Sequence, residues 1–348
     1  MNDQNIIVFT GAGFCVPMGL PTTNQFKHII DRFDSTPIGI ALFGYLGEEF
    51  YYDIEHVLSS LDSFSNQSSL IKHILEYPPY QGNGNEHGYL KSANAVYKTL
   101  TKAANTLSLE LKRSLFDVLS VYDTVKSEKL YENLLNEIYT HHFNPSISFF
   151  TTNYDLTFED AQDNLESVYS KLGITKVDYG FTEKNQRFIY DNNNKYNFNP
   201  TTLEYKKLHG SLDWSINNDR VYKSGNIIKP TDLEKMLLIY PGNKGTPKNE
   251  PYISLHRNLL ERLIDAARVY VIGFAFRDDY INSQFDTALK INKDLEVYCI
   301  NPSEIKNYPK ESKTPYFVKT YPKRFIYIKK SVNSDDEFPL DLKSFLKH

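Results

Sequence analysis

Cysteine is almost absent from this 348-residue sequence, which contains only Cys15 and Cys299. Two cysteines cannot build a disulfide framework or a zinc site with four thiolates. Long apolar runs are also missing, since no stretch approaches the roughly 18–20 apolar residues that a membrane-spanning helix needs. The first apolar run, residues 6–9, is too short for the core of a secretory signal. We therefore expect a cytoplasmic protein.

Neither sign of charge is in large excess, because 43 acidic residues face 39 basic ones and the net charge is −4. This balance lacks the overall basic character of a nucleic-acid-binding domain, and we predict no direct binding to nucleic acid. The charged fraction of 24% and the apolar fraction of 41% are typical of a globular protein. A chain of this length folds as one large domain or two smaller ones.

Continuous apolar segments predict strands that are buried on both faces, as in a parallel sheet. They are residues 5–9, 146–151, 269–274, 295–300 and, as a possible last strand, 325–330. After the first strand, apolar residues at helical spacing predict a helix over 22–33. Between the third and fourth strands, Ile281 and Phe285 predict a crossover helix. Strands that alternate with helices predict an α/β fold with a doubly wound, parallel, Rossmann-like sheet.

The region between the first two predicted strands is helical in pattern. An apolar stripe with intervals of three and four residues runs from Val96 to Tyr122. We therefore predict a helical insertion into the α/β domain. The predicted boundaries are 1–35 and 141–330 for a catalytic domain, 36–140 for the helical insertion and 331–348 for a C-terminal tail.

One stretch inside the predicted catalytic domain is unusually polar. Residues 182–207 are rich in asparagine and charged side chains, which is more typical of a surface hairpin or loop than of a core element. The paired lysines at its end, Lys206 and Lys207, are expected to be solvated.

Two glycines, Gly11 and Gly13 in the segment TGAG, follow the first predicted strand at once. Glycine lets the backbone turn sharply and approach a phosphate closely, and the next helix would present free N–H groups and the positive end of its dipole. The segment is not a full dinucleotide fingerprint, since Val16 stands where a third glycine is required. On its own the pair is as typical of a tight turn as of a nucleotide site.

Three other segments place polar or small residues after predicted strands. Asn153 and Asp155 follow the second strand, at the edge where open α/β sheets bind ligands, although such residues also cap helices. His209, in the segment KLHG, could stand at a strand end as a general base, because histidine titrates near neutral pH. A lone histidine is nevertheless more often structural. Gly273, after the third strand, would let a ligand approach the backbone closely.

Taken in order, these motifs resemble those of the sirtuin family, and in particular the sirtuin-like NAD hydrolases of bacterial antiphage defence. The resemblance covers about residues 1–30 and 145–305 and implies roles for single residues. The implied catalytic residues are Asn153, which holds the ribose and the attacking group, Asp155, which binds the nicotinamide carboxamide, and His209, the general base. The implied NAD⁺-binding residues are Gly11, Ala12, Gly13, Thr152, Gly273, Phe274 and Asn301.

The sequence departs from the family pattern at two main points. Cys15 stands where sirtuins usually have serine, and near a helix N-terminus its thiol could be reactive; the alternative is a small, buried apolar residue. Deacetylases of this family carry a zinc ribbon after the HG pair, which is His209–Gly210 in this sequence. The ribbon is missing here, because residues 210–270 contain no cysteine. We therefore expect no metal and favour water over acyl-lysine as the acceptor. Glu55 resembles a helix residue near the family's site, and its alternative is a solvated charge.

The resemblance implies an NAD⁺ glycohydrolase that cleaves NAD⁺ to nicotinamide and ADP-ribose and acts as an abortive-infection effector. NAD⁺ would be consumed as the substrate, so no resident cofactor is expected. An NAD-dependent protein deacylase and a non-catalytic NAD or ADP-ribose sensor are the alternatives. Because uncontrolled NAD⁺ hydrolysis would be toxic to the cell, we expect a homo-oligomer with contacts through 40–140. The implied partner is a HerA-type ATPase or, alternatively, a short Argonaute.

Overall fold

The computed structural model describes most of the chain. The described residues are 5–33, shorter stretches between 36 and 64, 84–184, 187–190, 199–217, 220–224, 233, 235–238, 250–302 and 319–331. Glu55 lies outside them, so its predicted proximity to the site stays a prediction.

The chain forms two compact units. The first contains residues 1–22, 118–239 and 244–348, and the second contains 23–117 and 240–243. These divisions differ from the predicted domain boundaries chiefly because helix α5 (Thr124–His141) packs within the first unit. The ring of Tyr131, on this helix, lies 5.3 Å from that of Phe14 and 5.1 Å from that of Phe158.

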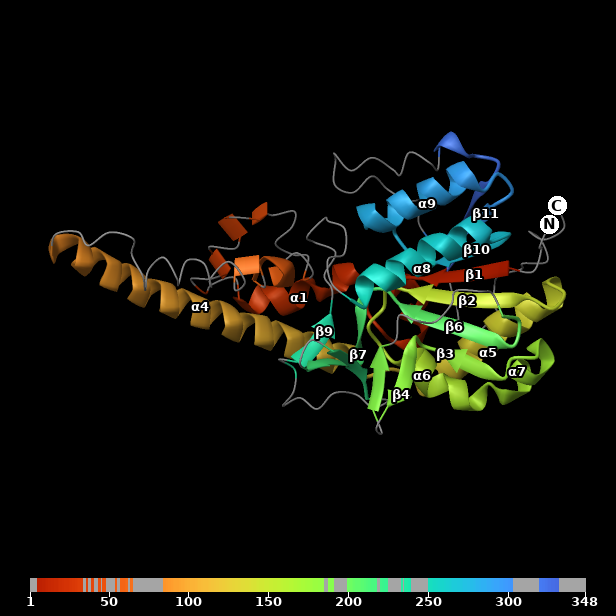
Figure 1. The fold of residues 1–348 in the computed structure, drawn as a ribbon, viewed down its shortest axis with the longest axis horizontal. Helices are drawn as coiled ribbons and strands as arrows, with labels where there is room; N and C mark the ends of the chain where they lie inside the picture. Colours follow the sequence, from red (N-terminus) through yellow and green to blue (C-terminus); the bar gives the residue numbers. More distant parts are fainter. Residues whose placement is uncertain are drawn as a thin grey trace. The chain divides into compact units, whose positions relative to one another are not determined.

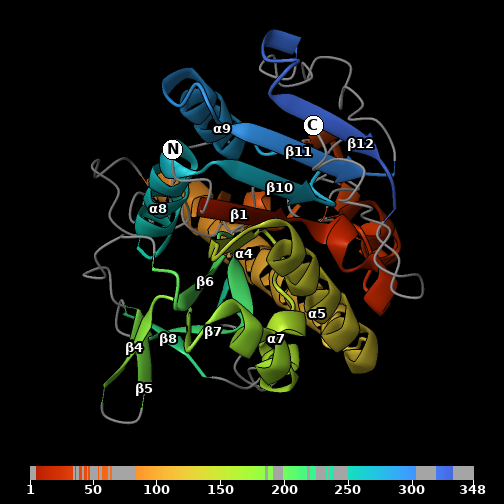
Figure 2. The ribbon, with the colours of Figure 1, turned by 90° about the vertical axis from the view of Figure 1, so that its right-hand side faces the viewer.

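A parallel sheet of seven strands forms the centre of the first unit. Figures 1 and 2 show β11, β10 and β1 of this sheet side by side. Its strand order is β12–β11–β10–β1–β2–β6–β3, and every neighbouring pair is parallel. The strands are β1 (Asn5–Thr10), β2 (Ser146–Thr151), β3 (Lys176–Asp178), β6 (Thr202–Lys207), β10 (Arg268–Ile272), β11 (Glu296–Asn301) and β12 (Phe325–Lys329). This arrangement confirms the predicted α/β fold with a parallel, doubly wound sheet.

Helices flank this sheet. They are α5, α6 (Thr157–Ala161), α7 (Glu166–Leu172), α8 (Tyr252–Asp265) and α9 (Asp279–Ile291). Ile7 and Phe9 of β1 belong to the same buried cluster as Leu259 of α8 and Phe285 of α9. Helix α5 packs against α6 and α7 (Figure 2). Burial of apolar residues from strands and helices is the main stabilising term of such a layered fold.

A five-stranded antiparallel sheet includes the segment that comes after the HG pair. Its order is β4–β5–β8–β7–β9, with β4 (Phe181–Lys184), β5 (Arg187–Tyr190), β7 (Gly210–Asn217), β8 (Arg220–Lys223) and β9 (Met236–Leu238). Trp214 of β7 is buried and its ring lies 5.0 Å from that of Phe181. Within the described residues, no cluster of three or more histidines, cysteines or acidic residues is placed to bind a metal.

The prediction of a surface hairpin or loop over 182–207 was only partly right. Strands β4 and β5 do form a hairpin, but β6 is a strand of the central sheet, between β2 and β3. Lys206 and Lys207 were expected to be solvated, and both are buried. Their ammonium groups are tolerated there because Asp178 and Glu159 pair with them at 2.9 and 3.0 Å.

The second unit contains short helical turns and the greater part of a long helix. Residues 23–33 form a 3₁₀ turn, the four-residue helix α1 (Lys27–Ile30) and another 3₁₀ turn, instead of the single helix predicted over 22–33. Helix α4 (Gly84–Leu119) carries the predicted apolar stripe. The stripe is buried from Ala104 to Leu115, whereas Val96 and Leu100 are exposed. None of the helices in the described part of the chain is long and apolar enough to cross a membrane.

Candidate functional site

The glycine segment after β1 packs directly on the segment after β10. The Gly11 N–H donates to the carbonyl of Ile272 and the Gly13 N–H to that of Gly273, each at 3.0 Å. A Cβ at Gly11 would lie 2.8 Å from the Gly273 oxygen, and Gly273 itself has a φ of +67°. Glycine is therefore required here for a backbone-to-backbone contact as well as for any approach of a ligand.

Two three-residue 3₁₀ turns, Ala12–Phe14 and Val16–Met18, follow these glycines, and the helix predicted further on, over 22–33, is reduced to the four-residue α1 between 3₁₀ turns. Such short turns lack the aligned peptide dipoles of a full helix. The prediction that a helix dipole supports phosphate binding at this loop was therefore wrong. The N–H groups of Gly11, Gly13, Phe14 and Cys15 all donate to backbone carbonyls, so these four residues do not offer the free N–H groups that the sequence predicted.

Asn153 and Asp155, beyond the end of β2, lie beside the glycine segment. The Asn153 amide donates to the Gly11 carbonyl and contacts the Cys15 sulfur, both at 3.1 Å. Asp155 Oδ1 accepts from the backbone N–H of Thr157 at 3.1 Å and from its hydroxyl at 2.6 Å. Asp155 Oδ2 has a longer contact, 3.5 Å from the Cys15 sulfur. The structure thus brings these residues together, and Asp155 also binds Thr157, the first residue of the following helix.

Cys15 is not a reactive thiol. Its side chain is buried, and burial together with the negative charge of Asp155 raises the pKa of the Cys15 thiol well above its usual range. Hydrogen bonds from Thr157 and Asn153 oppose this effect without cancelling it. Burial and the raised pKa both favour the second interpretation of Cys15, a small, buried apolar side chain.

His209 lies just past the end of β6 and pairs with an aspartate far along the chain. Its Nε2 is 3.2 Å from Oδ2 of Asp278, and both side chains are largely buried. Burial alone would raise the pKa of the Asp278 carboxyl group. The hydrogen bond from His209, the charge of His209 when it is protonated, and the hydrogen bond from the Ile281 N–H outweigh burial and lower this pKa.

A second histidine, His256 of α8, completes this group. Its ring centroid is 6.5 Å from that of His209, and its Nδ1 is 3.3 Å from the amide oxygen of Gln284. Burial and, whenever His209 is protonated, the repulsion between the two imidazolium rings lower the pKa of His256 to about 4. His256 is therefore neutral at physiological pH.

The remaining predicted residues also lie at this edge of the sheet. Asn301, which ends β11, donates from its amide to the carbonyl of Phe274 at 2.8 Å. The Thr152 N–H donates to the carbonyl of Thr10 at 3.2 Å. Tyr154 connects the two groups of residues, since its ring lies 6.4 Å from that of His209. All of these residues follow or end parallel strands at their carboxyl ends, where open α/β sheets bind ligands.

Comparison with known protein families identifies the domain. The model of the SIR2-like domain matches residues 147–325, which is just over half of the chain. The chain belongs to the SIR2-like family. No curated protein gives a significant match. Among solved structures, a Sir2 homologue in complex with NAD is 13% identical, with 98% of this chain and 90% of that chain covered and a TM-score of 0.47. A triple variant of Sir2 homologues in complex with 2′-O-acetyl ADP-ribose is 12% identical, with coverages of 97% and 92% and a TM-score of 0.42.

This SIR2-like domain contains a buried lysine that sequence reasoning missed. Lys207 Nζ bonds the backbone carbonyl of Asp155, donates to the Ser211 hydroxyl at 2.9 Å and pairs with Glu159. Burial raises the pKa of Glu159 although Lys207 and Lys223 stand beside it. The apolar residues beside the lysine pair, Tyr205 and Leu208, were the signal of a buried strand.

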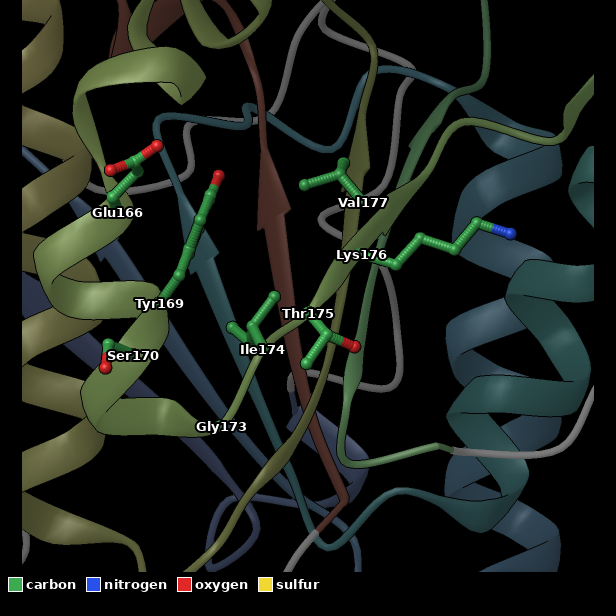
Figure 3. A pocket seen from close by; sticks show the side chains of 8 residues that line it. All are labelled: Glu166, Tyr169, Ser170, Gly173, Ile174, Thr175, Lys176 and Val177. Carbon is green, nitrogen blue, oxygen red and sulfur yellow. The ribbon is translucent and has the colours of Figure 1, made fainter.

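The SIR2-like domain also has a hollow away from the predicted residues. Side chains of α7 and of the segment that enters β3, from Glu166 to Val177, line it (Figure 3). Because this segment precedes β3, the hollow lies at the amino end of that strand. The predicted site residues lie at the opposite edge, so this hollow is separate from them.

Proposed function

We propose that this SIR2-like protein is an NAD⁺ glycohydrolase that cleaves NAD⁺ to nicotinamide and ADP-ribose. The observation that carries the proposal is that Asn153 and Asp155 lie beside the glycine segment at the carboxyl edge of the sheet, with the ring of Tyr154, between them in sequence, 6.4 Å from that of His209. Members of the SIR2-like family are usually NAD-dependent enzymes, and solved structures similar to this chain are described as complexes with NAD or an ADP-ribose derivative. NAD⁺ is the substrate here and not a resident cofactor.

Each polar side chain has a defined part in this reaction. The bond between nicotinamide and C1′ of the ribose breaks with its electron pair on the nicotinamide, and a water oxygen bonds C1′. His209 accepts the proton that the water loses, and Asn153 holds the ribose and the water in line. Asp155 binds the carboxamide of the leaving group. Of its two oxygens, Oδ2 has more capacity to accept a further hydrogen bond, because Oδ1 already accepts two from Thr157, whereas Oδ2 accepts one from the Cys15 thiol, which is a weak donor.

Water is the proposed acceptor of the ADP-ribosyl group because the segment after His209–Gly210 lacks the cysteines of a deacetylase zinc ribbon. The chain has no cysteine between 210 and 270 from which a thiolate zinc site could form, and a part of this stretch folds as strands β7, β8 and β9 of the antiparallel sheet around the buried Trp214. A protein deacylase needs a groove for acyl-lysine in addition to the NAD⁺ site, whereas a hydrolase needs only room for water.

The biological role that we propose is abortive infection, with the activity controlled by assembly. Depletion of NAD⁺ arrests a cell, so the enzyme must be held inactive until a trigger arrives. We propose a homo-oligomer that contacts its neighbours through helix α4, where Val96 and Leu100 are exposed one turn apart, and a HerA-type ATPase as the partner, with a short Argonaute as the alternative. Apolar side chains on an exposed helix face are suited to such contacts.

Product analysis tests the proposed reaction. Purified protein, alone and assembled with the partner ATPase, is incubated with NAD⁺ with and without an acetylated peptide, and the products are separated by chromatography. Hydrolysis gives equal amounts of nicotinamide and ADP-ribose whether or not peptide is present. Acetylated ADP-ribose that forms only with the peptide would establish the deacylase instead. Calorimetric NAD⁺ binding without nicotinamide release in either state would establish the non-catalytic sensor.

A further inference from the structure

The contact between His209 and Asp278 joins two residues that are 69 positions apart in the chain. His209 stands in the turn between β6 and β7, and Asp278 stands at the start of α9. Nε2 and Oδ2 are 3.2 Å apart, within hydrogen-bonding distance, and the side chains of the pair are only 4% and 12% exposed. A carboxylate–imidazole contact this well shielded from water is stronger than an exposed one.

The carboxylate of Asp278 is held in place independently of His209. Its other oxygen, Oδ1, accepts from the backbone N–H groups of Tyr280 and Ile281 at 2.9 and 3.0 Å, so Asp278 is the N-cap of α9. One oxygen is committed to the helix, and the second faces the histidine. A long helix packed into the core therefore fixes the point at which the imidazole ring is held.

The chemistry of the pair decides which ring nitrogen carries the proton. An ionised carboxylate only accepts hydrogen bonds, so the nitrogen next to it must donate, and that nitrogen is Nε2. In a neutral imidazole the other nitrogen then has the free electron pair. Within the described residues no hydrogen bond involves Nδ1 of His209, which leaves this nitrogen able to accept a proton.

The neighbouring groups do not compete for Asp278. His256, the second histidine of the group, makes two contacts with Gln284. Its ring nitrogen Nδ1 contacts the amide oxygen of Gln284, and the amide nitrogen of Gln284 donates to the backbone carbonyl of His256 at 2.7 Å. The Tyr280 ring lies 5.1 Å from the ring of His256. The imidazole of His256 is thus held by α9 in its own position.

We propose that Asp278 is a positioning residue that fixes the His209 tautomer with the proton on Nε2, so that Nδ1 is the atom that takes the proton from water. This inference rests on the proposed NAD⁺ hydrolysis, because it names the reacting atom of the base in that reaction. After proton transfer both ring nitrogens are protonated, and the carboxylate of Asp278 stabilises the imidazolium that forms. The proton returns to solvent when the products leave.

The tautomer can be measured without any substrate. In protein labelled with ¹⁵N-histidine, the His209 resonances are assigned by their loss in His209→Gln. We expect Nε2 to resonate as a protonated ring nitrogen and Nδ1 as an unprotonated one. The opposite pattern, or an average of the two, overturns the proposal even in a protein that cleaves no NAD⁺. The failure of the proposed function and the failure of this inference are therefore distinguishable.

Two substitutions at Asp278 separate its role in positioning from its role in capping. Asp278→Asn keeps a good N-cap and the size of the side chain but removes the charge, whereas Asp278→Glu keeps the charge and weakens the cap. A positioning role predicts that Asn lowers kcat by about 10²–10⁴-fold with little change in KM, and that Glu retains more activity than Asn. A purely structural role predicts the reverse order.

Asp279→Asn is the matched control, since it makes the same change in net charge one residue further along, at an exposed position. It should leave kcat and the His209 tautomer unchanged. Thermal unfolding of all three variants shows which of them are folded, and if Asp278→Asn does not fold, Asp278→Ser replaces it because serine also caps helices. Wild-type kcat in a folded Asp278→Asn variant would overturn the proposal.

Discussion

Lys207 and Glu159 form a buried ion pair, with Nζ and Oε1 3.0 Å apart and side chains that are 2% and 8% exposed. The pair links β6 to α6, and the same ammonium group holds the backbone of Asp155. Removing Lys207 leaves the buried Glu159 with only the more distant Lys223, at 3.9 Å, and takes away the donor to the Asp155 carbonyl and the Ser211 hydroxyl. We predict that Lys207→Met lowers the free energy of unfolding by about 3–5 kcal/mol, as measured by urea denaturation.

An exposed ion pair provides the comparison. Arg257 and Glu261 on α8 are 2.9 Å apart, but their side chains are 72% and 36% exposed. Water screens this pair, so Arg257→Met should change the free energy of unfolding by less than about 1 kcal/mol. Equal losses in Lys207→Met and Arg257→Met would contradict the argument that burial makes the first pair important.

A second prediction concerns the contact between the two glycine segments. A Cβ at Gly273 would lie 2.2 Å from the backbone nitrogen of Phe14, so Gly273→Ala must push the two segments apart. Gly173 has a similar φ of +70°, but no atom lies within 4 Å of its Cβ position. Gly173→Ala should therefore cost only about 1–2 kcal/mol for the left-handed backbone, and Gly273→Ala clearly more. Similar losses in urea denaturation would show that the close contact has no effect on stability.

The third prediction tests the proposed catalytic residues. His209→Ala and Asn153→Ala should each lower the rate of NAD⁺ cleavage by about 10²–10⁴-fold, because one removes the base and the other the anchor of ribose and water. Both variants should still bind NAD⁺ in calorimetry, since the glycine segments are unchanged. His141→Ala is the control, because His141 ends α5 and pairs with Glu137 at 3.4 Å, away from the site. Wild-type cleavage by either variant would show that the assigned roles are wrong.

Much of the central sheet could be predicted because its strands are continuously apolar. Strands β1, β2, β10, β11 and β12 match predicted segments to within two residues at each end. Strand β6 was missed because its sequence ends in two lysines. Their burial depends on Asp178 and Glu159, which belong to other elements, and no local pattern of charge reveals such a partner.

The candidate site was predictable only in part for the same reason. The position of Asn153, Asp155 and His209 after strands follows from the order of apolar and polar segments, since parallel strands share one carboxyl edge. The pairing of His209 with Asp278 depends on how α9 meets the β6–β7 turn, and the raised pKa of Cys15 depends on complete burial beside Asp155. Both are consequences of tertiary packing, which the motif spacing does not contain.

The last prediction uses the pH dependence of stability. The pKa of His256 is lowered to about 4 in the folded protein, whereas an unfolded histidine titrates near ~6.5. The unfolded chain therefore binds a proton at this residue as the pH falls below about 6.5, while the folded protein does not do so until about pH 4. The stabilising contribution is complete above the unfolded value and is lost between these two limits. The pKa of Asp278 is also lowered, but the stability that a lowered aspartate pKa contributes is fully present above the unfolded value of ~3.9 and is lost only below it, so it changes mainly outside this window.

The change expected from His256 is about 3 kcal/mol, since each unit of pKa difference corresponds to ~1.36 kcal/mol. When the pH is lowered from 7 to 4, the free energy of unfolding should fall in both proteins. We predict that the fall is larger in the wild type than in His256→Gln, and that the difference between the two falls is about 3 kcal/mol. Glutamine cannot take up a proton, so the variant lacks this contribution at every pH. Above pH 7 the two stability curves should run parallel, because histidine is neutral in both the folded and the unfolded chain. If they also run parallel between pH 7 and pH 4, His256 is protonated equally in both states, and the neutral, buried histidine inferred beside His209 is contradicted.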